Sequence, residues 1–228
     1  MRTRQEIKAI GKERFQSRYW PCVGTSFLIT GIIGALSAVL SKEEYVDSVY
    51  GEIAIRTPIP LGFLVTIPLT IGLCYYFIQL ILGRDEELSV GTVFKTGFTG
   101  YGRKLGGYLW MELFTFLWSL LFVIPGIIKS FSYAMTPYIL SDCPNVKATD
   151  ALKLSMRIMR GRKGELFVFY LSFLGWAILS ALTAGILAVF YVYPYFYSST
   201  ACWYLEAREA AVRDGVITMG QLEGTEPV

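Results

Sequence analysis

Histidine is absent from the sequence, and charged residues make up only 17% of its 228 positions. Without histidine, the chain lacks the commonest general base and the commonest transition-metal ligand of proteins. The four cysteines are isolated from one another, and none belongs to the Cys-x-x-Cys pair typical of metal or redox sites. These absences argue against a hydrolase or a metalloenzyme. We therefore expect no metal, no cofactor, no disulfide and no enzymatic activity.

Apolar residues are plentiful, at 54% of the sequence, which is too many for an ordinary soluble domain. The net charge is only +3, so nucleic acid is not an expected partner. The sequence predicts a single integral membrane domain over residues 1–228, an all-α polytopic helix bundle. A span needs about 20 apolar residues, and about six runs approach that length. The predicted spans are residues 22–40, 60–82, 105–124, 127–141, 166–182 and 185–204.

Polar segments flank these spans. Residues 1–19 are basic and predict either a helix lying on an anionic membrane surface or a solvated tail. Residues 41–59 predict an acidic loop outside the cell, and residues 206–228 a polar cytoplasmic tail. Most Lys and Arg residues fall on the side of the two termini. The positive-inside rule then predicts a multi-pass protein of the cell membrane with both termini in the cytoplasm.

One pattern occurs twice, at residues 90–118 and 148–176. Each copy has an amphipathic helix, a turn with basic residues and glycine, and then a hydrophobic helix. Ser89 can cap the first of these helices. Residues 89–103 and 145–161 are therefore predicted to be amphipathic interfacial helices, although such a stripe can equally face a protein core. The hydrophobic helix of each copy is followed by a second predicted span. Two spans restore the original direction of the chain, so we expect a parallel internal repeat.

Several motifs in the second half of the chain resemble one bacterial family. They are Ile124-Pro-Gly-Ile-Ile-Lys129, Tyr138-Ile-Leu-Ser-Asp142, Met159-Arg-Gly-Arg-Lys163 and Tyr193-Pro-Tyr195. The sequence resembles the domain of unknown function 975 family of multi-pass membrane proteins. That family is distantly similar to the membrane domain of some glycerophosphodiester phosphodiesterases. The resemblance implies a membrane architecture, and it supplies no activity and no catalytic residue.

Glu112 is the one acidic residue well inside a predicted span. A rise of about 1.5 Å per residue from Lys104 places it about 12 Å into a hydrocarbon core about 30 Å thick. An ionisable group at that depth is costly unless it is paired, solvated or protonated, which makes it a candidate functional residue. Similar depth predicts a ligand-binding cluster of Glu112, Gln79, Tyr138 and Tyr170. Alternatively, a protonated Glu112 bonded to a tyrosine only locks helices together.

The basic residues after the second amphipathic helix are a second candidate site. Arg157, Arg160, Arg162 and Lys163 can bind anionic lipid head groups, or they can simply fix the topology.

These patterns predict a protein that binds or moves a lipid or a small amphiphile. The alternative is a non-catalytic scaffold or assembly factor for other membrane proteins. The expected partners are membrane lipids, with other membrane proteins or a second copy of the chain as further candidates. A cavity that reaches Glu112 would favour binding, whereas a closed, packed region would favour the scaffold.

Overall fold

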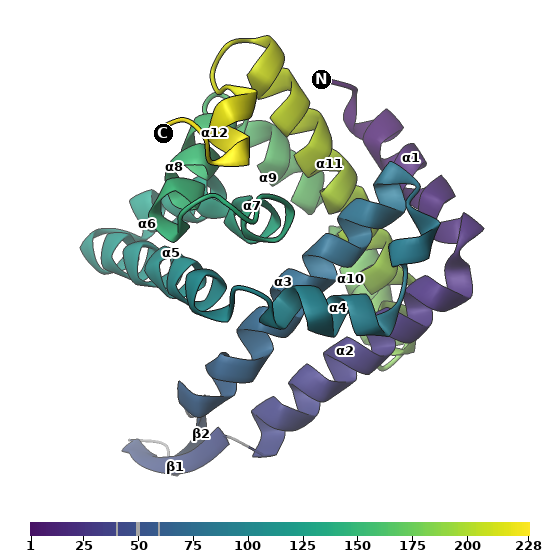
Figure 1. Ribbon diagram of the computed structural model, residues 1–228. Coiled ribbons are helices and arrows are strands. Elements are labelled where there is room, and N and C mark those ends of the chain that lie inside the picture. The colour runs from purple at the N-terminus through teal and green to yellow at the C-terminus, as the bar shows by residue number, and fades with distance from the viewer. Residues whose placement is uncertain (40, 49–50, 59) are drawn as a thin grey trace.

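The computed structural model describes residues 1–39, 41–48, 51–58 and 60–228. This part of the chain is helical apart from one β-hairpin, and the hairpin lies at the end of the molecule opposite to both termini (Figure 1). The helices are α1 (Arg4–Ser17), α2 (Tyr19–Val39), α3 (Pro60–Leu82), α4 (Val90–Phe98), α5 (Tyr101–Leu121), α6 (Val123–Tyr133), α7 (Thr136–Asp142), α8 (Ala148–Ile158), α9 (Lys163–Leu171), α10 (Leu174–Leu182), α11 (Tyr193–Arg213) and α12 (Met219–Glu223), with a 3-10 turn η1 (Asp85–Glu87) and a π-helix η2 (Ala188–Val192).

The predicted acidic loop is a hairpin in the structure. Strand β1 (Ser41–Ser48) pairs antiparallel with β2 (Gly51–Pro58), in a register that joins Ser41 to Pro58 and Ser48 to Gly51. The sequence analysis did not predict the two strands within this acidic loop, because the charges of the segment obscured its β-branched residues. Ile53 and Ile55 alternate along β2, which favours a strand.

Three helical segments of the described residues are long and apolar enough to cross a membrane: Tyr19–Val39, Leu64–Leu82 and Lys163–Leu182. They correspond to the first, second and fifth predicted spans. The third segment comprises α9 and α10, which are separated by a short break at Ser172 and Phe173. Helix α5, the predicted third span, has 21 residues but also carries Arg103, Lys104 and Glu112.

Two predicted spans are not continuous α-helices. Residues 127–141 divide into α6 and α7, and α7 has only 7 residues. Pro137 lies in the first turn of α7, where its missing N–H cannot continue the preceding helix. Residues 185–204 contain the π-helix η2 before α11 starts, and α11 then continues to Arg213.

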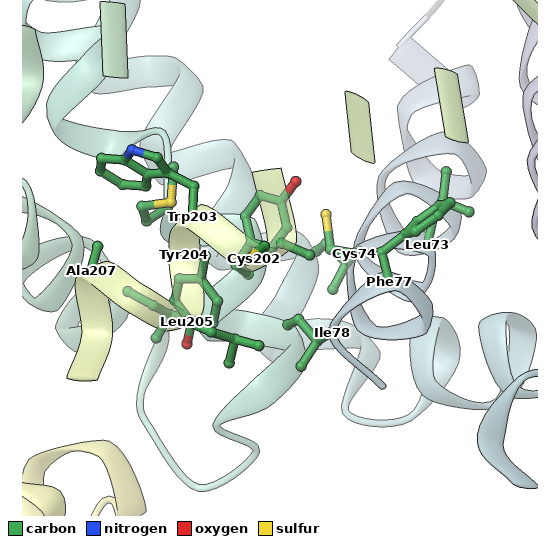
Figure 2. Packing of buried hydrophobic residues seen from close by; sticks show 14 of the residues in the cluster. Leu73, Cys74, Phe77, Ile78, Cys202, Trp203, Tyr204, Leu205 and Ala207 are labelled. Atoms are coloured by element: carbon green, nitrogen blue, oxygen red, sulfur yellow. The ribbon is translucent and has the colours of Figure 1, made fainter. Parts of the chain in front are cut away.

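Helix α11 is the centre of the packing, because it contacts both α1 and α3. Figure 2 shows Cys74, Phe77 and Ile78 of α3 on one side of the core and Trp203 and Tyr204 of α11 on the other. All these side chains are buried. Aromatic stacking adds to the contact, since the rings of Phe77 and Tyr197 lie 5.6 Å apart.

Helices α1 and α8 turn apolar residues towards protein. Ile7 and Phe15 of α1 are buried where that helix packs against α11, and Leu154 and Ile158 of α8 are fully buried. In α4, by contrast, Phe94 and Phe98 stay exposed. The stripe of α8 thus faces the protein core, which was the alternative to an interfacial helix, whereas the interfacial helix over residues 89–103 stays a prediction. Ser89 does cap α4, as predicted, by accepting a hydrogen bond of 3.1 Å from the Thr92 amide.

Pro68 lies inside α3 and deprives the Leu64 carbonyl of its normal helical donor. The hydroxyl of Tyr101, at the start of α5, donates to that carbonyl at 2.9 Å. A partner helix thus satisfies the group that the proline leaves free.

Tyr101→Phe is expected to lower the free energy of unfolding by about 1 kcal/mol, because the Leu64 carbonyl loses its donor. Thermal denaturation in detergent micelles measures the change. Tyr193→Phe is the control, since its hydroxyl makes no hydrogen bond within the described residues. An equal loss in both variants would contradict the assigned role of Tyr101.

Candidate ligand-binding groove

A groove of about 410 Å³ lies between α2, α3 and α5. All three helices are spans in the sequence prediction, and α2 and most of α3 are among the segments able to cross a membrane. The groove is lined by Ile33, Ser37, Thr66, Ile67, Thr70, Tyr108, Leu109 and Glu112. Glu112 is the only carboxylate among these side chains.

The wall formed by α3 is less polar than its sequence suggests. Thr66 donates its hydroxyl proton to the Gly62 carbonyl at 3.1 Å, and Thr70 donates to the Thr66 carbonyl at 2.9 Å. Both hydroxyls are therefore bonded within their own helix, as is usual for threonine in an apolar setting. The groove offers a ligand a mainly apolar surface with one carboxylate.

Glu112 itself makes no hydrogen bond or ion pair within the described residues. Its side chain is exposed on α5, and Tyr108, one helical turn earlier, is close enough to interact with it electrostatically. An unpaired carboxylate beside an apolar groove can accept hydrogen bonds from an ammonium or hydroxyl group. The remaining surface can hold a hydrocarbon chain.

The structure does not bring the predicted cluster into one cavity. Gln79 is buried and accepts a hydrogen bond of 3.3 Å from Arg84, in a different pocket from Glu112. Tyr138 is buried against Tyr204, with their ring centroids 5.5 Å apart. The expected equal heights assumed one straight helix over residues 127–141. The break between α6 and α7 removes that assumption.

Tyr170 lies in a third place, an apolar pocket of about 440 Å³ among α6, α9, α10, η2 and α11. Its ring packs against Phe131 and Phe196, with centroid distances of 6.0 and 5.4 Å. It remains an electrostatic neighbour of Tyr138, so these two of the four predicted residues do lie near each other.

One known family matches part of the chain. Residues 120–211 match the family described as Protein of unknown function (DUF975). This match confirms the predicted resemblance and extends from the end of α5 through most of α11. The DUF975 segment therefore contains the central helix, whereas the groove residues precede it. None of the curated proteins and none of the solved structures matches the chain.

The predicted head-group residues lie within the DUF975 segment. Arg157 and Arg160 are exposed and form no ion pair with any described residue. Arg162 pairs with Asp214 at 2.8 Å and also donates to the Ile158 carbonyl at 3.2 Å, at the end of α8. Lys163 begins α9. Arg157 and Arg160 are thus available to a ligand, while Arg162 holds two segments together.

Tyr108 is a residue of the groove that the sequence analysis did not identify, although a signal for it was present. It precedes Glu112 by four positions, and residues at this spacing lie on the same face of a helix. That spacing could have identified it. Thr66 and Thr70 carried no comparable signal, because neutral residues in an apolar run are typical of any span.

Proposed function

We propose that the protein binds a lipid or a small amphiphile in the groove that reaches Glu112, either to hold it or to move it. The observation that supports this proposal is the groove itself, which would be absent if α2, α3 and α5 were packed shut. Ligand sites are typically concave and mainly apolar, with few polar groups that fix orientation. In this groove Glu112 supplies the polar group.

The proposed architecture has six spans in the cell membrane, with both termini in the cytoplasm. It is supported by large apolar side chains that stay exposed on α5, α6 and α10, where lipid would cover them. Examples are Phe116, Leu120, Val123, Ile124, Ile178 and Leu182. The proposal includes membrane lipids as partners and assigns no enzymatic activity.

A parallel repeat is part of the same proposal. Helices α4 and α8 begin at equivalent positions of the two sequence copies. Lys104 then donates to the Thr96 carbonyl near the end of α4, and the equivalent Arg162 donates to the Ile158 carbonyl at the end of α8. A basic side chain near the end of each helix stabilises its unpaired carbonyl groups.

Native mass spectrometry of gently solubilised protein tests the binding function. Glu112→Gln should reduce the amount of retained lipid or amphiphile about 10-fold, because the loss of one charge-assisted hydrogen bond lowers affinity by that order. Glu165→Gln is the matched control, since Glu165 is exposed on α9 and does not line the groove. It should retain as much as the wild type.

The double variant Arg157→Gln with Arg160→Gln examines the predicted head-group contact in the same experiment. Preferential loss of anionic lipids, with other lipids retained, would support that contact. Equal lipid content in all variants would contradict the binding proposal. A scaffold or assembly factor, whose exposed apolar helices contact other membrane proteins, would then explain the structure better.

A further inference from the structure

A second pocket lies where the ends of α3, α4 and α7 meet the start of α5. Its volume is about 390 Å³, and it shares no lining residue with the Glu112 groove. Its lining includes Tyr75, Arg84, Lys95, Thr96, Arg103 and Lys104. In the sequence its cations were interpreted only as determinants of topology.

The pocket carries an excess of positive charge. Arg84, Lys95, Arg103 and Lys104 line it, and none of them forms an ion pair within the described part of the chain. Asp142 is the one acid of the lining, and its carboxylate is already bound by Arg208 and by the Tyr204 hydroxyl. Glu87 acts electrostatically on Tyr75 from outside the lining.

Neutral backbone groups hold Arg103 in position. Its guanidinium donates to the carbonyls of Leu140 at 2.7 Å, Val146 at 2.8 Å and Cys143 at 3.2 Å. These bonds stabilise the end of α7 and orient the cation. They do not neutralise its charge, so an anion that enters the pocket meets a preorganised guanidinium.

Lys104 is nearly buried, at 4% exposure, and its ammonium donates to the Thr96 carbonyl. It precedes the apolar segment 105–124. Burial, with a smaller effect of the nearby Arg103, lowers the pKa of Lys104 to about 8. A buried cation without a counter-charge is costly, and a bound anion would offset that cost.

We infer that this pocket binds a phosphate group. Guanidinium and ammonium groups together suit phosphate oxygens, and the exposed Arg84 and Lys95 can close over a ligand from the rim. Tyr75 and Thr96 add hydroxyls that make no hydrogen bond within the described residues. The phosphate is either a free anion or the head group of a membrane lipid, because basic pockets beside spans accept both.

Two probes test the pocket on the full chain. Binding of inorganic phosphate to the solubilised protein is measured by titration calorimetry. Retention of phosphatidylglycerol from nanodiscs, compared with phosphatidylcholine nanodiscs, is measured by native mass spectrometry. Lys95→Gln and Arg84→Gln should each weaken binding about 10-fold, because each removes one charged contact. Lys12→Gln, which removes an exposed cation of α1, is the control.

The two sources give different results. Binding of inorganic phosphate that is weakened by the pocket variants and not by Lys12→Gln identifies a site for a free anion. Selective retention of phosphatidylglycerol with the same variant pattern identifies a head-group site. An equal effect of Lys12→Gln, or no binding of either probe, would overturn the inference.

This result is separable from the Glu112 groove. Glu112→Gln should leave phosphate binding unchanged, because Glu112 lies outside the lining of the basic pocket. Failure of the phosphate experiment would therefore leave the proposed amphiphile groove standing, and the converse also holds.

Discussion

Gly72→Ala is expected to lower the free energy of unfolding by about 3 kcal/mol, at the upper end of the usual cost of overpacking. A Cβ atom on Gly72 would lie 2.1 Å from the Val93 carbonyl oxygen, and one on Gly97 would lie 2.4 Å from the Pro68 carbonyl oxygen. Both close approaches join α3 to α4, and both involve backbone atoms that cannot turn aside. Thermal denaturation in detergent micelles measures the loss, and Gly97→Ala should show a similar one.

Gly102→Ala is the control for this pair. Gly102 lies in α5, and a Cβ atom there would meet no other atom within 4 Å. Alanine has the higher helix propensity by about 1 kcal/mol, so this variant should be as stable as the wild type or slightly more so. If Gly72→Ala matched Gly102→Ala, α3 and α4 would not pack as closely as the structure indicates.

Long, uninterrupted apolar runs were sufficient to predict the segments of α2, α3 and α9–α10 that are long and apolar enough to cross a membrane. Local chemistry was also predictable. Ser89 was predicted as a cap, because capping arises within one helical turn. The donor to the carbonyl that Pro68 leaves free, Tyr101, was not predictable, since it depends on how α5 returns to α3.

Periodicity was less informative about what covers an apolar face. The stripes of α1 and α8 showed that one side of each helix is buried, but the same stripe suits lipid or protein. Ile7 and Ile158 contact protein, a result that depends on tertiary packing. The sequence analysis also did not predict the break between α6 and α7, because Pro137 can kink a helix as well as end one.

The candidate site was only partly predictable, because its residues lie on different helices. The depth of Glu112 follows from helical rise alone, and the structure does place this residue in a groove. The prediction of its neighbours depended on the relative heights of residues on separate helices. The break between α6 and α7 changes these heights. The basic pocket was missed because Arg84 and Lys95 are distant from Arg103 in sequence and meet only when α3, α4, α5 and α7 assemble.

Arg208→Met is expected to lower the free energy of unfolding by about 3 kcal/mol. The substitution removes the ion pair of the mostly buried Asp142 carboxylate and leaves it only the hydrogen bond from Tyr204. Arg208 of α11 pairs with Asp142 at the end of α7, and the Tyr204 hydroxyl donates to the same carboxylate at 3.0 Å. The side chains of Arg208 and Asp142 are only 22% and 12% exposed, so water replaces little of the lost interaction. Thermal denaturation at pH 7 measures the change.

The double variant Arg208→Met with Asp142→Asn distinguishes a lost ion pair from lost packing. Removing both charges leaves no buried carboxylate without a partner, and Tyr204 can still donate to the asparagine carbonyl. The double variant should therefore be about 1–2 kcal/mol more stable than Arg208→Met alone, because groups in direct contact have a coupling energy large enough to offset the second substitution. Arg213→Met is the control, since Arg213 is 68% exposed and its one ion pair within the described residues is with the neighbouring Asp214. The single variant Asp142→Asn completes the comparison. If the losses of free energy of Arg208→Met and Asp142→Asn were simply additive in the double variant, the contact between α7 and α11 would not depend on the paired charges.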